Sequence, residues 1–205
     1  GGARPLERGA EGGDGAPRRA AAELVQQLQS LGLAELQQRQ DLAGLDIVGM
    51  GITFTVYSDG RGIDRAWPFD VIPRVIAADE WRGIERGLVQ RLRAINMFID
   101  DVYHEQRVIH DGVFPAELLE HSVNFRRECV GANPKFGVWA HISGSDLVRD
   151  GDGTMYVLED NLRVPSGVSY MLENRAISKR AFADIFAKQS ILPVDAYPER
   201  LRRIL

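Results

Sequence analysis

Acidic and amide side chains in the last third of the chain are spaced so that they can share one face of a β-hairpin. Asp146 precedes the dipeptide Asp152-Gly153, and Glu159 and Asn161 follow it. An Asp-Gly pair between alternating apolar residues is a strong signal for a two-residue hairpin turn. With that turn, Asp146 lies opposite Glu159 and Gly144 lies opposite Asn161. Any other loop with an even number of residues shifts the pairing but keeps Asp146 and Glu159 on the same face.

The shared face predicts a metal site. Glu159 and Asn161 are two residues apart and therefore point to the same side of their strand. Two opposed carboxylates repel each other unless a cation lies between them. Carboxylate and amide oxygens are hard ligands that suit Mg²⁺. We therefore expect Asp146, Glu159 and Asn161 to bind magnesium beside Gly144, a glycine that leaves space for a ligand. The alternative is a solvated face that binds no metal.

A turn with two nearby arginines follows the acidic face. Ser166 and Gly167 come directly after a proline, and Arg163 and Arg175 lie on either side of them. Such a turn can present backbone N–H groups and a hydroxyl to a phosphate or carboxylate. The two guanidinium groups could clamp the same anion through paired hydrogen bonds. An ordinary loop with surface arginines remains the alternative.

Hydrophobic periodicity predicts the elements that must position these residues. Apolar residues recur at steps of three and four in the helical segments, and alternate in the strands. The long helix begins near Asp79, which can cap it. A mixture of a long helix and antiparallel hairpins is typical of the α+β class, with the hairpins forming a sheet against the packed helix. The expected helices cover residues 20–31, 33–40, 79–102, 115–120 and 176–187, and the expected strands cover 52–57, 63–69, 138–148 and 154–161.

Length and composition limit the classes of protein that the chain can represent. Its 205 residues are 44% hydrophobic and fit one large domain, or one domain with a small partner. A net charge of −4 excludes an obvious nucleic-acid surface. Cys129 is the only cysteine, so the chain has no internal disulfide and no cysteine-rich zinc site.

Localisation and domain limits follow from the distribution of apolar residues. No apolar run approaches the ~20 residues of a membrane helix, and no leader is visible, so we expect a cytoplasmic protein without a membrane partner. Residues 1–19 are rich in glycine and poor in large apolar side chains. They predict a disordered tail, and residues 20–205 form the folded part.

Several long motifs resemble a known family. The resemblance extends over about residues 33–205, and its motifs lie at residues 51–57, 67–74, 85–88, 103–107, 127–131 and, above all, 156–175. The chain resembles the bacterial circularly permuted ATP-grasp proteins, distant relatives of glutathionylspermidine synthase. The resemblance implies an ATP- and Mg²⁺-dependent carboxylate–amine ligase that works through an acyl phosphate. Its partners would be a small-molecule or peptide carboxylate and an amine acceptor, with no nucleic acid.

The resemblance also implies roles for individual residues. In ATP-grasp enzymes an acidic residue and a Glu-x-Asn element hold the magnesium ions on the ATP phosphates, and these map onto Asp146, Glu159 and Asn161. Arg163 and the Ser166-Gly167 turn would lie near the transferred phosphate or the acceptor carboxylate.

The chain departs from the family pattern after the Glu-x-Asn element. The nucleotide-binding lysines and a glycine-rich loop are expected there, but only Lys179 and Lys188 follow, without such a loop. We therefore expect an N-terminal part of a longer protein that is inactive alone.

Two other functions remain as alternatives. A non-catalytic ATP-grasp-like binding or scaffolding module is the stronger one. A nuclease core is the weaker one, because Asn161 stands where that chemistry needs a lysine and because the chain is acidic.

Overall fold

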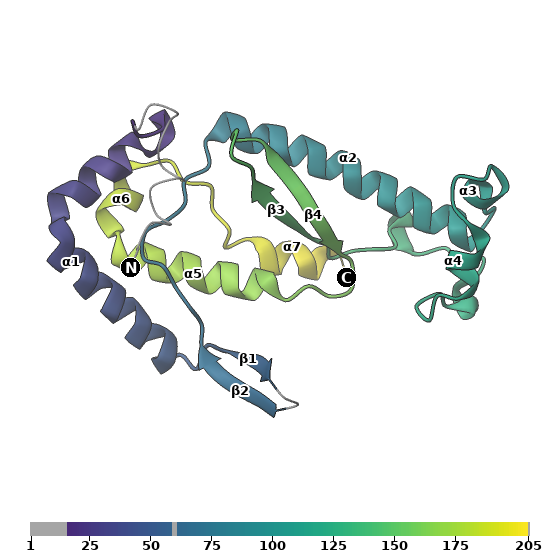
Figure 1. Ribbon diagram of the computed structural model, residues 1–205, viewed down its shortest axis with the longest axis horizontal. Helices are drawn as coiled ribbons and strands as arrows, with labels where there is room; N and C mark the ends of the chain where they lie inside the picture. Colours follow the sequence, from purple (N-terminus) through teal and green to yellow (C-terminus); the bar gives the residue numbers. More distant parts are fainter. Residues whose placement is uncertain (1–15, 59–60, 205) are drawn as a thin grey trace. The chain divides into compact units, whose positions relative to one another are not determined.

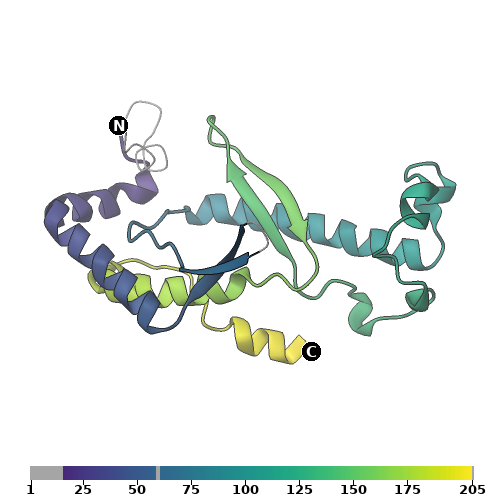
Figure 2. The same ribbon diagram turned by 60° about the horizontal axis from the view of Figure 1, so that its bottom comes forward.

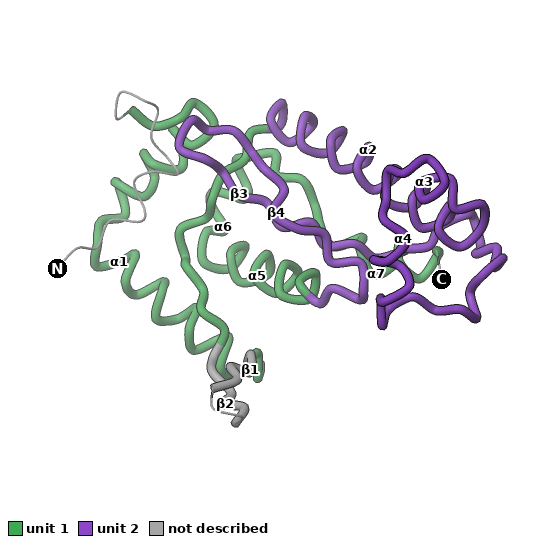
Figure 3. Tube along the Cα trace, turned by 45° about the vertical axis from the view of Figure 1, so that its right-hand side comes forward, with its two compact units in different colours: residues 1–77, 167–205 green, residues 78–166 purple. Residues whose placement is uncertain are grey.

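The fold was analysed in a computed structural model that describes residues 16–58 and 61–204, with only the backbone described for residues 54–58 and 61–66. Figures 1 and 2 show the chain from two directions. The chain divides into two compact units, which are coloured separately in Figure 3. Unit 1 comprises residues 1–77 and 167–205, and unit 2 comprises residues 78–166.

The expected tail, residues 1–19, lies mostly outside the described residues. Among those described, Nη2 of Arg18 donates a hydrogen bond to the carbonyl oxygen of Val75 at 3.4 Å. Ala21 is already buried. A tertiary contact is therefore already present at Arg18, within the expected tail.

Unit 1 is built on the long helix α1 (Ala22–Gly49), which follows the short 3₁₀ helix η1 (Arg19–Ala21). A break at Gly32, where φ is 75°, confirms the interruption predicted there. Glycine adopts this left-handed conformation without steric cost. The second half of α1 extends past the predicted end at residue 40. The other elements of unit 1 are β1 (Thr53–Ser58), β2 (Arg61–Ala66), α5 (Gly167–Ala181), α6 (Ala183–Lys188) and α7 (Tyr197–Ile204).

Two clusters of buried apolar side chains hold unit 1 together. One consists of Leu24, Val71, Phe182 and Ile185, and the other of Ala43, Ile47 and Ile177. Phe182 has a non-helical φ of −132° and separates α5 from α6, so the single helix predicted over 176–187 is wrong. Its side chain is only 1% exposed. Burial of the ring contributes roughly 1.5–3 kcal/mol, which offsets the cost of breaking the helix.

Unit 2 consists of a long helix, a hairpin that faces it and a set of short turns (Figure 1). Helix α2 (Ala78–Tyr103) confirms the predicted long helix and begins one residue before Asp79. The hairpin is formed by β3 (Gly144–Arg149) and β4 (Met155–Asn161). Its first strand is shorter than the predicted 138–148. The remaining elements are α3 (Arg107–His110), α4 (Ala116–Glu120), η2 (Arg127–Cys129) and η3 (Lys135–Gly137).

Aromatic stacking and hydrogen bonds at the C-terminal end of α2 hold the segment that precedes the hairpin. The Tyr103 ring lies between the rings of Phe125 and Trp139, with centroids 5.0 and 4.9 Å away. Oδ1 of Asn96 accepts a hydrogen bond from the backbone N–H of Trp139 at 2.8 Å. The indole N–H of Trp139 donates to Asp100 at 2.9 Å. These contacts fix the segment that enters β3 against the same helix on which the hairpin lies.

The described residues form an α+β structure, but their strands do not form a common sheet. β1 pairs only with β2, and β3 only with β4. The expectation that the hairpins form one sheet is therefore wrong for the described residues. The reason is that the two hairpins belong to different units, and each satisfies its inner hydrogen bonds with its own sequence neighbour. No helix in the described part of the chain is long and apolar enough to cross a membrane.

Candidate functional site

The predicted acidic face is present on the β3–β4 hairpin. Asp146 lies directly opposite Glu159, and Gly144 lies opposite Asn161, as the sequence predicted. Nδ2 of Asn161 donates a hydrogen bond to Oε1 of Glu159 at 3.0 Å, so these two side chains share one side of β4. Asp146, Glu159 and Asn161 are all exposed. Two carboxylates and one amide therefore meet on the open face of the hairpin.

The turn that leads to this register differs from the predicted one. The backbone N–H of Asp150 donates to the carbonyl of Thr154 at 2.9 Å, which leaves residues 151–153 as a three-residue loop. The N–H of Gly153 donates back to the carbonyl of Asp150 at 3.0 Å, and Gly153 has a φ of 89°. A three-residue loop that ends in a left-handed glycine is a common hairpin connection. The prediction of a two-residue turn is therefore wrong.

The odd length of this loop is compensated by a β-bulge. Val157 lies opposite Leu147, while Glu159 lies opposite Asp146, so Leu158 is an extra residue in β4. Leu158 and Glu159 are consecutive, yet both side chains are exposed. Without the bulge, Asp146 would face Leu158, and Glu159 would turn towards α2. The acidic face therefore depends on the bulge, a device that often redirects side chains next to active sites.

Asp160, between Glu159 and Asn161, was not predicted as part of the site. Its side chain points to the opposite face, is 7% exposed and lies 2.5 Å from Nε of Arg91 on α2. The hydroxyl of Ser145 donates to its other carboxylate oxygen at 2.7 Å. The hydrogen bond from Ser145, followed by that from Arg91, holds the pKa of Asp160 below its usual value. Strand alternation was the available signal, because a carboxylate on the helix-facing side needs a partner.

Gly144 does not leave space for a ligand, which corrects the sequence-based expectation. A Cβ at this position would lie 2.9 Å from Cβ of Pro165 and 3.8 Å from Cβ of Asn161. The segment that follows β4 therefore packs where a side chain at position 144 would lie. Pro165 packs at this point immediately after Val164, which has an unusual φ of 47° for a β-branched residue.

The residues of the predicted anion turn are distributed over both units. Arg163 is exposed, and its side chain forms no ion pair or hydrogen bond with another described residue. Ser166 ends unit 2, and Gly167 begins α5 in unit 1. Arg175 also belongs to unit 1, where its Nη1 donates to the carbonyl of Leu192 at 2.7 Å and its guanidinium lies 5.8 Å from the centre of the Phe186 ring. Arg175 thus has local structural contacts that the sequence did not reveal.

The exposed face has a suitable set of donors for a hard cation. Among the described residues, no three His, Cys, Asp or Glu side chains form a metal-binding group. The candidate set instead combines the carboxylates of Asp146 and Glu159 with the amide of Asn161. These donors fit Mg²⁺, which typically takes one or two carboxylates and keeps positions for water and phosphate oxygens.

Comparisons with known proteins identify the family of this chain. The family model described as circularly permuted ATP-grasp type 2 matches residues 73–205. An uncharacterized protein of Synechocystis sp. is 47% identical over 191 residues, which are 93% of this chain and 40% of that protein. An uncharacterized protein of Mycobacterium tuberculosis is 44% identical over 84% of this chain and 30% of its own length.

A relative whose name states a function is also matched over only part of its length. A protein of Frankia casuarinae named "Putative glutamate--cysteine ligase 2-2" is 35% identical over 93% of this chain and 22% of its own length. The chain thus spans less than half the length of each of these relatives. Because the family match covers more than half of the chain and includes the whole hairpin, the chain belongs to the circularly permuted ATP-grasp type 2 family.

Proposed function

We propose that this chain supplies the metal-binding hairpin of an ATP- and Mg²⁺-dependent carboxylate–amine ligase. The observation that carries the proposal is the pairing of Asp146 with Glu159, with Asn161 on the same exposed face. Membership of an ATP-grasp family and the ligase name of the Frankia relative support the same class of reaction.

The residues of the exposed face have complementary roles in this proposal. Asp146 and Glu159 would hold magnesium as anionic ligands. The amide nitrogen of Asn161 donates to Glu159, so its oxygen is the group that remains to contact a cation. Magnesium held here would neutralise charge on the ATP phosphates during phosphoryl transfer. Arg163 follows β4 closely, and its exposed guanidinium would bind the transferred phosphoryl group or the substrate carboxylate.

The proposed reaction has two steps. An oxygen of the substrate carboxylate attacks the γ-phosphorus of ATP, which releases ADP and forms an acyl phosphate. The nitrogen of the amine acceptor then attacks the acyl carbon and loses a proton. Inorganic phosphate leaves with the original carboxylate oxygen. The substrate is proposed as a small-molecule or peptide carboxylate.

The nucleotide-binding lysines are proposed to lie in the longer protein, beyond the part matched by this chain. The Synechocystis relative is matched over only 40% of its length, which leaves room for them. We therefore expect the isolated chain to bind ATP weakly and to form no product.

Hydroxylamine trapping tests the proposal in the longer protein. The expected result is release of ADP and phosphate only with the correct acid, and capture of the acyl phosphate as a hydroxamate. Glu159→Gln should abolish hydroxamate formation, because it removes a charged metal ligand. The matched control is Glu120→Gln, which changes an exposed carboxylate on α4 of the same unit and should leave the rate unchanged.

Two results would contradict this assignment. Hydroxamate formation by Glu159→Gln at the wild-type rate would remove the hairpin from the reaction. Mg²⁺ binding without any ADP formation, across a broad panel of acids, would instead support a non-catalytic binding module.

A further inference from the structure

We propose that Asp160 and Arg91 are positioning residues for the metal-binding face. Their ion pair anchors β4 on α2 with the bulge in place, so that Glu159 and Asn161 point to the opposite, exposed side. The inference rests on the proposed function for the identity of that face. Its structural part, the control of strand register, stands on contacts within unit 2 alone.

Both oxygens of the Asp160 carboxylate are held by different elements. Oδ2 lies 2.5 Å from Nε of Arg91 on α2, and Oδ1 accepts a hydrogen bond from Ser145 on β3 at 2.7 Å. The Asp160 side chain is 7% exposed. Because successive side chains of a strand point to opposite faces, holding Asp160 towards α2 directs its two neighbours away from it.

The bulge makes such an anchor necessary. Ser145 lies directly opposite Asp160, whereas the pairing nearer the turn is offset by one residue because of Leu158. If β4 continued in that offset register, Glu159 would face the helix and Asp160 the exposed side. The hydrogen bond from Ser145 and the ion pair with Arg91 are both formed only with Asp160 on the helix side. They therefore select the bulged register.

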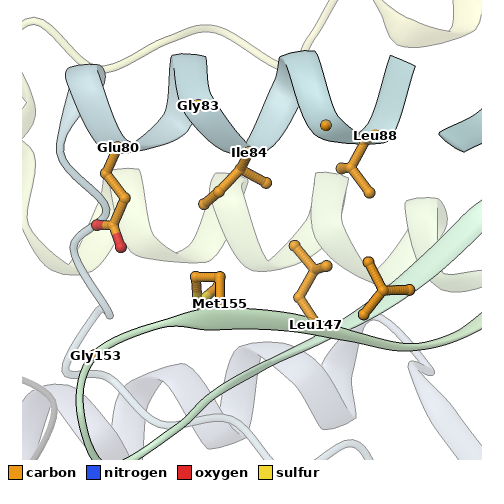
Figure 4. A pocket seen from close by; sticks show the side chains of 9 residues that line it. Glu80, Gly83, Ile84, Leu88, Leu147, Gly153 and Met155 are labelled. Carbon is orange, nitrogen blue, oxygen red and sulfur yellow. The ribbon is translucent and has the colours of Figure 1, made fainter. Parts of the chain in front are cut away.

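Apolar packing between the hairpin and α2 does not supply this anchor. A pocket of about 420 Å³ separates them (Figure 4) and is lined by Ile84, Leu88, Leu147, Met155 and Val157. On the helix side, Gly83 and Gly87 contribute no side chain to fill it. Among the described residues of unit 2, only Val102 belongs to the fully buried apolar set. The middle of the interface is thus loosely packed.

Ion pairs hold the hairpin on α2 at both ends of this pocket. Arg149 pairs with Glu80 near the turn, and Asp160 pairs with Arg91 beside the acidic face. The Glu80–Arg149 pair lies on the turn side of the bulge. It holds the same hairpin on the same helix, but it does not determine the register of Glu159 and Asn161. It therefore provides a matched control.

The test measures Mn²⁺ affinity and hydrogen exchange in the intact chain. Mn²⁺ takes the same oxygen ligands as Mg²⁺ and is counted directly by its paramagnetic resonance. Asp160→Asn and Arg91→Gln should each weaken Mn²⁺ binding about tenfold, the usual effect of losing a residue that orients a metal ligand. Both should also speed exchange of the backbone amides of β4. Arg91→Lys keeps the cation and should restore most of the affinity. Glu80→Gln should destabilise the hairpin but keep the Mn²⁺ affinity.

The outcomes separate a failure of the inference from a failure of the proposed function. Wild-type Mn²⁺ affinity in Asp160→Asn, with loss of binding in Glu159→Gln, would overturn the positioning role alone. Equal losses of affinity in Asp160→Asn and Glu80→Gln would also overturn it, since both ion pairs would then act only through stability. Wild-type affinity in Glu159→Gln would overturn the metal site. In that case the hydrogen-exchange rates of the β4 amides would still test whether the Asp160–Arg91 pair controls the strand register. Unchanged rates in Asp160→Asn and Arg91→Gln would overturn that control as well.

Discussion

Replacing Gly144 with alanine should destabilise unit 2 by about 1–3 kcal/mol, the typical cost of inserting a methyl group into a close contact. The new Cβ would lie 2.9 Å from Cβ of Pro165 and 3.3 Å from its Cγ. Carbon atoms prefer separations of about 3.5–4.0 Å, so one group must move by roughly half an ångström or more. The proline ring cannot rotate away from the contact, because it is part of the backbone. The shift must therefore pass to the segment that carries Arg163.

Urea denaturation followed by circular dichroism measures this cost, and the same hairpin offers a matched control. A Cβ on Gly151 would meet no atom within 4 Å, and this glycine is not in the left-handed region. Gly151→Ala should therefore change the free energy of unfolding by less than about 0.5 kcal/mol. Pro165→Gly removes the opposing Cβ, and in that background Gly144→Ala should cost much less. Equal effects of the Gly144 and Gly151 substitutions would refute the close-contact explanation.

Three further predictions concern other parts of the chain. Gly87→Ala should stabilise the protein by up to about 1 kcal/mol, because a Cβ there meets no atom within 4 Å and alanine favours the helix. Thermal unfolding measures this, and a lower melting temperature would contradict it. Hydrogen bonds from Thr154 lower the pKa of Asp152 below its usual 3.8, so the stabilisation by this carboxylate is present above that pH and is lost as the pH falls further. An NMR titration should find the low pKa, and a value at or above 3.8 would exclude it. Arg175→Ala removes the hydrogen bond to Leu192 and should lower the free energy of unfolding by about 1–2 kcal/mol without changing the Mn²⁺ affinity. A selective loss of Mn²⁺ affinity would instead give Arg175 a direct role at the metal.

The acidic face could be predicted from the sequence, although two details of its construction could not. Strand alternation and the Asp-Gly signal predicted the observed pairing of Asp146 with Glu159 and of Gly144 with Asn161, but through a turn that does not form. The loop has one residue more than predicted, and the bulge at Leu158 adds one residue to β4. These two changes cancel. The bulge depends on contacts of Asp160 with another strand and a distant helix, which no local pattern encodes.

Long-range packing explains two other differences between prediction and structure. The helical pattern over residues 176–187 continues without a local break, but the burial of Phe182 against α1 and the segment around Val71 divides it. The short helix α7 was not predicted, although Tyr197, Leu201 and Ile204 stand at helical spacing within it. The local sequence around Gly144 does not reveal its neighbour Pro165, which is 21 positions away in the chain. For Phe182 and for Gly144, the deciding contact is distant in sequence.

The metal role of the hairpin is tested most directly by ADP formation in the longer protein that carries both Asp146→Asn and Glu159→Gln. Both substitutions keep the size of the side chain and remove its charge, so the hairpin should remain folded. Loss of the metal removes several kcal/mol of charge stabilisation from phosphoryl transfer. Acid-dependent ADP formation should fall at least about a thousandfold, while the circular dichroism spectrum should be unchanged. ADP formation that survives the loss of both carboxylates would contradict it.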